Sequence, residues 1–290
     1  MTALPSALGE DAITAFDVCA LPLVRRLAAL LDRDPAGLRE GDALPRGWHA
    51  MLFNAPTPQS QLRSDGAAQL GVPLPDIGLP RLVMGGRQNR FTGDIPIGAR
   101  VHRESRHGEV QIKHGRSGRF ALVKVEHRIF VDGTREPALT ETLDYILRGA
   151  DTPAAPVTQQ APREAAASAT TSSVAQHTPI ALRTIVPDER LLFRYSAITD
   201  NPHRIHYDQP YAVAQEGYPA LVVNGSIPTM FLLEMFRAAA GREPAALSSR
   251  NLAAMFCGQP LHLGVSRDDA GWHLWAHDDQ GQTTFDARAT

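Results

Sequence analysis

Alternation of apolar and polar residues predicts an antiparallel hairpin in the first half of the chain. Over residues 119–131, valine and isoleucine fall on one side of an extended chain, and lysine, glutamate and arginine fall on the other. This period of two predicts a half-buried strand. Asp132-Gly133 follows, which is typical of a two-residue hairpin turn, and residues 139–147 alternate again as the returning strand.

Helical periodicity appears at two other places. Leucines at helical spacing predict an amphipathic helix over residues 20–32. Residues 228–240 are apolar nearly all round, so they predict a buried helix, and Gly241 suits its C-terminal cap. A strand-like run at 191–196 comes before this helix.

The end of the chain predicts a meander of strands around the buried helix. Short alternating runs at 262–266, 272–277 and 283–287 are separated by turn residues. One apolar helix followed by antiparallel strands is typical of a sheet wrapped around that helix. The pattern therefore predicts an α+β fold.

A segment of different composition divides the chain. Residues 151–178 contain eight Ala, five Thr, three Pro and three Ser among 28 residues. Such a stretch has too little apolar surface to offset the entropy of ordering, which predicts a linker. We expect an N-terminal domain over 1–150 and a C-terminal domain over 179–290, with no close sequence repeat between them.

Composition narrows the class of protein. The formal net charge is -2 and no basic stripe stands out, so we expect no nucleic-acid partner. No apolar run is long enough to span a bilayer, and the N-terminus lacks the pattern of a signal peptide. The two cysteines, Cys19 and Cys257, lack the spacing of a disulfide framework or a metal site. These features predict a cytoplasmic protein.

A polar cluster at residues 200–208 holds the candidate acid–base chemistry. His203 and His206 lie close to Asp200 and Asn201, and an Asn-Pro pair favours a turn between them. Adding water to an activated alkene needs a base for the water and an acid for the carbon, and His with Asp commonly fills both roles. By spacing alone, the favoured interpretation is that Asp200 and Asn201 shape a turn and the histidines are polar surface residues. His203 and His206 could share a metal site, but no third potential ligand stands at a recognisable spacing from them.

A second feature stands at the start of the buried helix. An apolar run leads into Asn224-Gly225, and free backbone N–H groups at a helix start can bind a developing oxyanion. The simpler interpretation is that Gly225 only permits the turn. An acid–base cluster followed by such a helix start indicates this chemistry more specifically than either feature alone.

These residues resemble the two-domain MaoC-like hotdog hydratases. That family includes mesaconyl-C4-CoA (3-methylfumaryl-CoA) hydratase, itaconyl-CoA hydratase and hydroxyacyl-thioester dehydratase type 2. Its signature is similar to Tyr195–Asp208 and to the Val-Val-Asn-Gly segment that ends at Gly225. Further matches in the first half fall at 44–49, Phe53, 85–87 and 115–118. The resemblance implies a double hotdog, in which two antiparallel sheets each wrap a central helix, and it places the catalytic motif in the C-terminal domain alone.

The resemblance also implies roles for individual residues. His206 is the expected catalytic histidine, Gly225 is the oxyanion donor, and Asn224 stands where the family usually has His. Asp200 precedes His206 by six positions, whereas Asn201 precedes it by five, which is the family's Asp–His spacing. Asp200 is the chemically suited partner, and Asn201 and His203 stay open as alternatives.

The resemblance implies reversible addition of water to an enoyl-CoA or a carrier-bound thioester, without a metal or other cofactor. If the acyl group carries a second carboxylate, an Arg fork suits it, and Arg87, Arg194 and Arg204 are candidates. Arg116 is a candidate for the coenzyme A phosphates. The family also predicts a homo-oligomer, such as a dimer. A hotdog thioesterase and a non-catalytic acyl-thioester binding subunit remain as alternatives.

Overall fold

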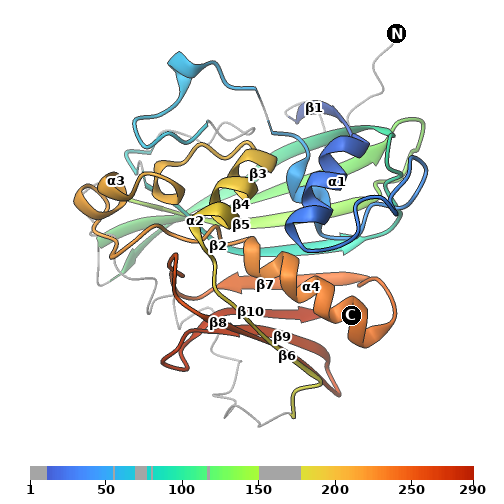
Figure 1. Cartoon of the computed structure of the whole chain (residues 1–290). Helices are drawn as coiled ribbons and strands as arrows, with labels where there is room; N and C mark the ends of the chain where they lie inside the picture. The colour runs from blue at the N-terminus through green and yellow to red at the C-terminus, as the bar shows by residue number, and fades with distance from the viewer. Residues whose placement is uncertain (1–11, 55, 69–76, 80, 116–117, 150–177) are drawn as a thin grey trace.

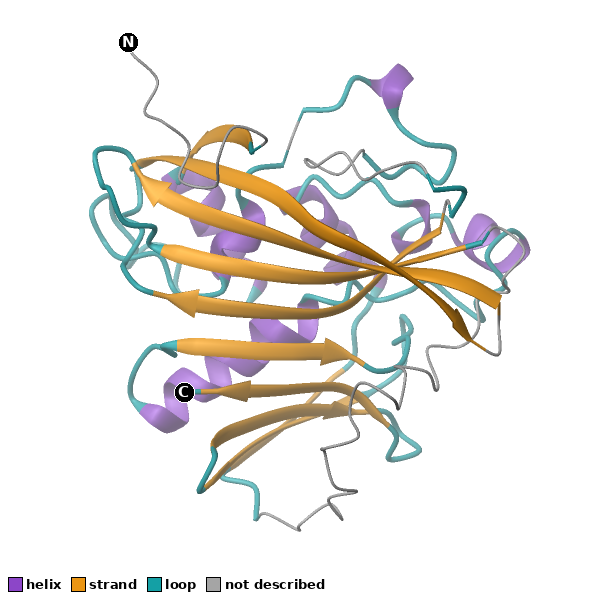
Figure 2. Cartoon of the chain, turned by 180° about the vertical axis from the view of Figure 1, so that it is seen from behind, coloured by secondary structure: helices purple, strands orange, loops and turns teal. Residues whose placement is uncertain are grey.

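One antiparallel sheet runs through the whole molecule (Figures 1 and 2). The structure is a computed structural model that describes residues 12–54, 56–68, 77–79, 81–115, 118–149 and 178–290. Its ten described strands lie in the order β1-β3-β4-β5-β2-β7-β10-β9-β8-β6. Arg116 and all of the expected linker except Thr178 lie outside the described residues.

The strands divide equally between the two halves of the chain. Those of the first half are β1 (Ile13–Val18), β2 (Arg81–Phe91), β3 (Arg100–Gly115), β4 (Gly118–Val131) and β5 (Leu139–Arg148). Those of the second half are β6 (Ala181–Ile185), β7 (Ala246–Asn251), β8 (Leu261–Asp268), β9 (Gly271–His277) and β10 (Thr283–Ala289). The α-helices are α1 (Leu21–Leu30), α2 (Glu189–Ile198), α3 (Gln209–Ala214) and α4 (Ile227–Ala240). Short 3-10 turns are η1 (Trp48–Met51), η2 (Gln59–Gln61) and η3 (Arg204–His206).

The two halves repeat one strand topology. Read from its outer edge, the first half runs β1-β3-β4-β5-β2, and the second half runs β6-β8-β9-β10-β7 in the corresponding order. The innermost strands of the halves, β2 and β7, pair antiparallel from Arg87–Ser249 to Arg90–Ala246. The repeat is therefore one of topology, although no close repeat is visible in the sequence.

Helices α1, α2 and α4 lie on one face of this sheet, and Figure 2 shows the other face. Helix α4 contacts β8 and β9, and nine of its residues are buried. It also packs against the first half: Leu233 occupies the space that a side chain at Gly47 would need, and Trp48 Nε1 donates to Glu234 Oε1 at 3.2 Å. One cluster of buried apolar residues consequently spans both halves.

The predictions for the helix at 228–240 and the terminal strands are confirmed by α4, β8, β9 and β10. The strand predicted at 191–196 is wrong, because these residues belong to helix α2. Asp188 caps that helix by accepting from the Leu191 N–H at 2.9 Å, and the buried Leu192, Tyr195 and Ile198 recur at helical spacing.

The predicted hairpin exists, but its turn is longer than two residues. Strands β4 and β5 pair antiparallel, and the pairing begins at Ile129–Leu139. Residues 132–138 connect them. Pro137 has no N–H to donate to a ladder, so pairing resumes only beyond it.

We expect Leu233→Ala to lower the free energy of unfolding by about 2–5 kcal/mol, because this fully buried side chain leaves a cavity between α4 and the first half. Because the two halves share one core, we also expect them to unfold together in a single cooperative transition. Urea unfolding followed by both tryptophan fluorescence and circular dichroism tests this. Phe193→Ala, at a side chain that is 67% exposed, is the control and should change stability by less than about 0.5 kcal/mol. Two separate transitions would contradict the shared core.

Candidate active site

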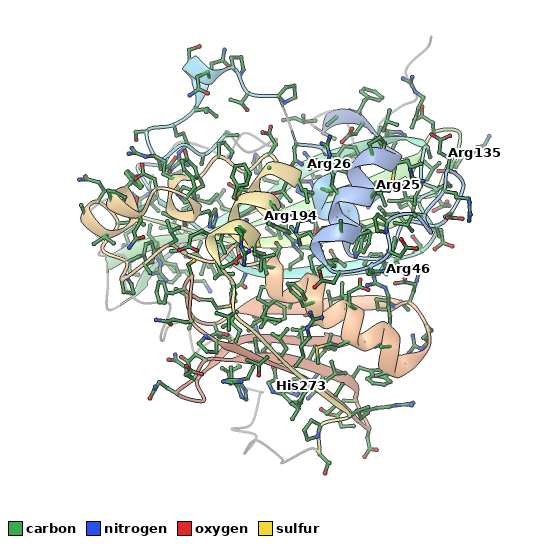
Figure 3. All side chains as sticks on the ribbon, viewed as in Figure 1. Arg25, Arg26, Arg46, Arg135, Arg194 and His273 are labelled. Atoms are coloured by element: carbon green, nitrogen blue, oxygen red, sulfur yellow. The ribbon has the colours of Figure 1, made fainter. Side chains whose placement is uncertain are left out.

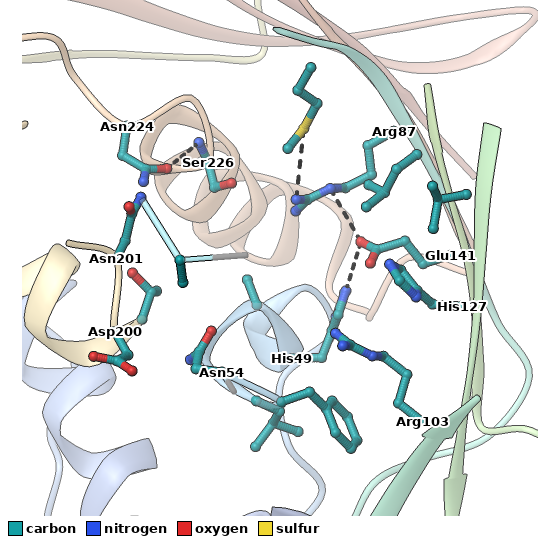
Figure 4. A pocket seen from close by; sticks show the side chains of 18 of the residues that line it. His49, Asn54, Arg87, Arg103, His127, Glu141, Asp200, Asn201, Asn224 and Ser226 are labelled. Carbon is teal, nitrogen blue, oxygen red and sulfur yellow. Dashed lines mark hydrogen bonds and ion pairs between the residues drawn. The ribbon is translucent and has the colours of Figure 1, made fainter. Parts of the chain in front are cut away.

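A cavity of about 380 Å³ lies between the two halves (Figure 4). The C-terminal half contributes helix α2, the loop after it and the start of α4, through Tyr195, Asp200, Asn201, His203, Asn224 and Ser226. The N-terminal half contributes the opposite wall, whose polar side chains include His49, Arg87, Arg103, His127 and Glu141. The cavity is therefore lined by charged and amide groups from both halves.

A sharp turn carries the acid–base cluster to this cavity. Helix α2 ends at Thr199, and Asp200 adopts a left-handed conformation with φ of 44°. Aspartate tolerates that conformation better than most residues, because its short polar side chain can bond locally. The Asn201 N–H then donates to the Ser196 carbonyl at 2.9 Å. The turn sets Asn201 half-buried in the wall and leaves Asp200 exposed at the margin.

His206 is buried next to this turn with a defined proton arrangement. Its Nδ1–H donates to the Val222 carbonyl at 2.7 Å. A carbonyl oxygen can only accept, so the proton stays on Nδ1 and the neutral ring carries its lone pair on Nε2. Burial lowers the pKa of His206 to about 4, with a smaller contribution from His203. His206 is therefore a neutral base at neutral pH.

His203 lines the cavity, whereas His206 is not among the residues that line it. The two rings are nearly perpendicular, with centroids 5.7 Å apart. Burial also lowers the pKa of His203. The His203 N–H donates to Asn201 Oδ1 at 3.2 Å, which leaves the amide nitrogen of Asn201 available to another acceptor. Within the described residues, no hydrogen bond or ion pair joins Asp200 to His206.

The start of α4 offers a free backbone donor. Asn224 Oδ1 accepts from the Ser226 N–H at 3.1 Å, and the Asn224 carbonyl accepts from Ile227 at 2.9 Å. The Gly225 N–H has no acceptor in the part of the chain that the structure describes. A Cβ at Gly225 would lie 2.8 Å from Asn251 Nδ2, so any larger residue here would have to displace the Asn251 side chain. Gly225 lines a smaller adjoining pocket together with Ser226 and Arg87, which both also line the main cavity.

The opposite wall is centred on a buried carboxylate. Glu141 lies on β5, where alternate residues point inward, and its Oε1 is 3.2 Å from Arg87 Nε and 3.3 Å from His49 Nε2. Burial by itself raises the pKa of Glu141, but Arg87 and then His49 outweigh it and hold that pKa well below its usual range. Figure 4 shows both interactions as dashed lines. Glu141 is therefore ionised.

His127 and Arg103 complete this wall, and sequence reasoning missed both of them together with Glu141. His127 Nδ1 lies 2.7 Å from Ser105 Oγ, and burial lowers the pKa of His127 to about 4. A signal was available, since His127 and Glu141 interrupt the apolar faces of the strands at 119–131 and 139–147. Polar residues at inward positions are uncommon unless they are paired or functional.

The arginines predicted from the sequence lie in different places. Arg87 lines the cavity. Arg204 lies outside it, where its Nη2 is 2.8 Å from Asp208 Oδ2 and its guanidinium stacks 3.9 Å from the Tyr211 ring. Arg194 is on the exposed side of α2 (Figure 3). Arg116 falls outside the described residues.

No group of three or more His, Cys, Asp or Glu side chains in the described residues is arranged to hold a metal ion. No helix in the same part of the chain is long and apolar enough to cross a membrane.

Comparison with known proteins identifies a family match over most of the chain. Residues 47–257 match the family described as hydroxyacyl-thioester dehydratase type 2. A curated relative, mesaconyl-C(4)-CoA hydratase of Chloroflexus aurantiacus, is 36% identical over 272 residues, which cover 93% of this chain and 91% of the relative.

Solved structures support the fold. A MaoC-like dehydratase from Phytophthora capsici matches with a TM-score of 0.65 at 12% identity, covering 96% of this chain and 95% of that one. A Mycobacterium tuberculosis protein described as having a double hotdog fold matches with a TM-score of 0.59 at 12% identity, covering 95% and 92%. At these identities the likeness concerns the fold alone, and it agrees with the repeated five-stranded topology.

We expect stability to fall as the pH is lowered from about 7 to about 5. The pKa values of His127 and His206 are about 4 in the folded protein, against about 6.5 for an unperturbed histidine. Between these pH values the unfolded chain binds more protons than the folded protein. Each group can therefore reduce the free energy of unfolding by up to about 1.4 kcal/mol for each pH unit by which the pH is lowered. Urea unfolding at the two pH values measures this.

Variants at single histidines identify the source of the pH dependence. His127→Gln removes one of the titrating groups and should flatten the dependence. His262→Gln, at an exposed histidine of β8, should leave it unchanged. Stability that is constant or rises toward pH 5 would contradict the buried neutral histidines.

Proposed function

The chain belongs to the hydroxyacyl-thioester dehydratase type 2 family and is a hydro-lyase of acyl thioesters, and from this premise we propose that its C-terminal half adds water to an enoyl-CoA at the cavity described above. The observation that carries the proposal is the state of His206. Its Nδ1–H is held by the Val222 carbonyl, which leaves Nε2 as an unprotonated base, and its ring lies against that of His203, which lines the cavity. Coenzyme A enters as part of the substrate, and no other cofactor is required.

The thioester carbonyl binds at the start of α4. In this proposal its oxygen accepts a hydrogen bond from the Gly225 N–H, where the positive end of the helix dipole also favours negative charge. This withdraws electrons from the conjugated double bond, so that Cβ becomes electrophilic. The free N–H and the tight approach of Asn251 that fixes Gly225 support this role.

His206 acts as base and then as acid. Its Nε2 removes a proton from water, the resulting hydroxide oxygen bonds to Cβ, and the electron pair of the double bond moves onto the thioester as an enolate held by Gly225. The protonated His206 then returns that proton to Cα. All atoms of one water are thereby added across the double bond, and dehydration is the reverse.

Asn201 orients the water in this proposal. It lines the cavity, its Oδ1 is occupied by the His203 N–H, and it stands five positions before His206. Its amide nitrogen can donate to the water oxygen while Nε2 of His206 accepts the proton. Asp200, the partner expected from the sequence, supports the mechanism less well because it is exposed and forms no described contact with His206.

The acyl group is proposed to be a branched dicarboxylic one, of the mesaconyl-C4 or itaconyl type. Support comes from the relative named mesaconyl-C(4)-CoA hydratase, which shares 36% identity over nearly the whole chain.

We further propose that residues 1–150 and 179–290 are two hotdog domains, and that only the second carries the catalytic motif. Helix α4 is the central helix of the second domain, and α1 with η1 takes the corresponding place in the first. The repeated strand order and the packing of α4 on β8 and β9 support this. The homo-oligomer and the cytoplasmic location stay predictions.

His206→Ala is expected to lower the kcat of hydration by about 100-fold or more, because it removes the general base. Asn201→Ala should lower kcat by about 10-fold or more through loss of water positioning, and Asp200→Asn should have a smaller effect. Loss of enoyl absorbance with crotonyl-CoA and mesaconyl-C4-CoA measures turnover, and a thiol assay measures thioester hydrolysis. His262→Ala is the control, and circular dichroism confirms folding. Near-native turnover of His206→Ala would refute the assignment, and release of free thiol by the native protein would indicate a thioesterase.

Gly225→Ala is expected to lower kcat by about 100-fold, because the added methyl would lie 2.8 Å from Asn251 Nδ2 and would displace the oxyanion donor. The double variant Gly225→Ala/Asn251→Ala provides room for the methyl and should recover part of the loss. Gly108→Ala is the matched control, since its methyl would meet only the Lys124 carbonyl at 3.7 Å. Full activity of Gly225→Ala would contradict the proposed donor.

A further inference from the structure

The N-terminal wall of the cavity carries more positive than negative charge. Arg87 and Arg103 contribute two guanidinium groups, and Glu141 is the carboxylate among them. Glu141 is already occupied, since its Oε1 lies 3.2 Å from Arg87 and 3.3 Å from His49. His127 adds no negative charge and, with its pKa lowered to about 4, no positive charge at neutral pH.

Of the two guanidinium groups in this wall, Arg103 is the one without an ion-pair partner among the described residues. Its Nε is buried without a hydrogen-bond partner, and within the described ranges no carboxylate lies within 4.0 Å of its guanidinium. Asp17 and Glu141 act on it only through space. The Asp17 carboxylate is engaged elsewhere, because its two oxygens accept from the N–H groups of Phe53 at 2.6 Å and Val18 at 2.7 Å.

The position of Arg103 is well defined. It projects from β3 into the cavity, and its guanidinium lies over the Phe53 ring, 5.2 Å from the centroid (Figure 4). Burial lowers the pKa of Arg103, yet a guanidinium stays protonated at neutral pH. A planar fork held against an aromatic ring is suited to a carboxylate, which it can bind through two parallel hydrogen bonds.

We propose that Arg103 is the specificity residue of the cavity and binds the free carboxylate of a dicarboxylic enoyl thioester. This inference rests on the proposed function, and it assigns the distal end of the acyl group to the N-terminal half. The thioester end lies at the start of α4 on the opposite wall. A half-buried cation without a directly bonded counter-ion is costly, so a substrate anion completes the wall.

The other arginines fit this role less well. Arg87 is paired with Glu141, so it positions that carboxylate and helps keep the wall charged. Arg204 is paired with Asp208 outside the cavity, and Arg194 is exposed on α2. Arg103 was not among the candidates from the sequence, because the strand that carries it alternates between arginine, histidine and glutamate without a clear apolar face.

Two substrates that differ only at the distal group test the proposal. Fumaryl-CoA carries a carboxylate where crotonyl-CoA carries a methyl group, and both share the enoyl thioester and the coenzyme A portion. Arg103→Met keeps the length and the apolar stem but removes the charge. We expect it to lower kcat/KM for fumaryl-CoA by about 100-fold and for crotonyl-CoA by less than about threefold. Arg103→Lys keeps the charge without the fork and should recover part of the loss.

Each alternative outcome has a distinct meaning. Equal losses with both substrates would overturn the proposal and would indicate that Arg103 binds the coenzyme A portion or supports the fold. Arg90→Met, at an exposed arginine of β2, is the control and should alter neither substrate. If Arg103→Met does not fold, the ratio of the two kcat/KM values in Arg103→Lys decides, and an unchanged ratio overturns the proposal. Failure of the native protein to hydrate either thioester would instead refute the proposed function.

Discussion

The pairing of β2 with β7 is the constraint on which the rest of the molecule depends. This short antiparallel ladder, from Arg87–Ser249 to Arg90–Ala246, joins the two five-stranded halves into one sheet. Each strand would otherwise leave a row of unpaired backbone groups at an edge. Arg87 lies on this ladder and also lines the cavity. The ladder therefore places the polar wall of the first half opposite the start of α4, with the cavity between them.

The two halves provide different chemistry to that cavity. The second half supplies the neutral His206, the Asn201 amide and a Gly225 N–H that has no acceptor among the described residues, which together suit the addition of water to a thioester-activated double bond. The first half supplies buried charge around Glu141. Burying several ionisable groups costs free energy compared with filling the same space with apolar side chains. A purely structural role therefore explains this wall poorly. The two halves therefore repeat one topology and present unequal chemistry to the cavity, which is consistent with our proposal that one half reacts and the other selects.

Several elements could be predicted from local sequence because their signals are local. Helix α4 is apolar nearly all round, and the strands around the Asp132-Gly133 turn alternate clearly. The local pattern at 191–196 predicts a strand, whereas these residues belong to helix α2. What identifies the helix is the capping bond to Asp188 and the burial of Leu192 and Tyr195, which appear only in the folded structure. Strands β2 and β7 were not predicted, since glycine, serine and arginine dominate them and their stability comes from pairing across the sheet.

For the site, the sequence by itself determined which residues near 200–206 and 224–225 are chemically competent, because acid–base groups, turn residues and a helix start are encoded within a few positions. Only the tertiary structure decided their states and their partners. The proton on His206 depends on Val222, sixteen residues away, and the room at Gly225 depends on Asn251. The opposite wall, with Arg103 and Glu141, is brought to the cavity by strand pairing alone. Charge and burial are properties of such distant neighbours, so no local pattern could express them.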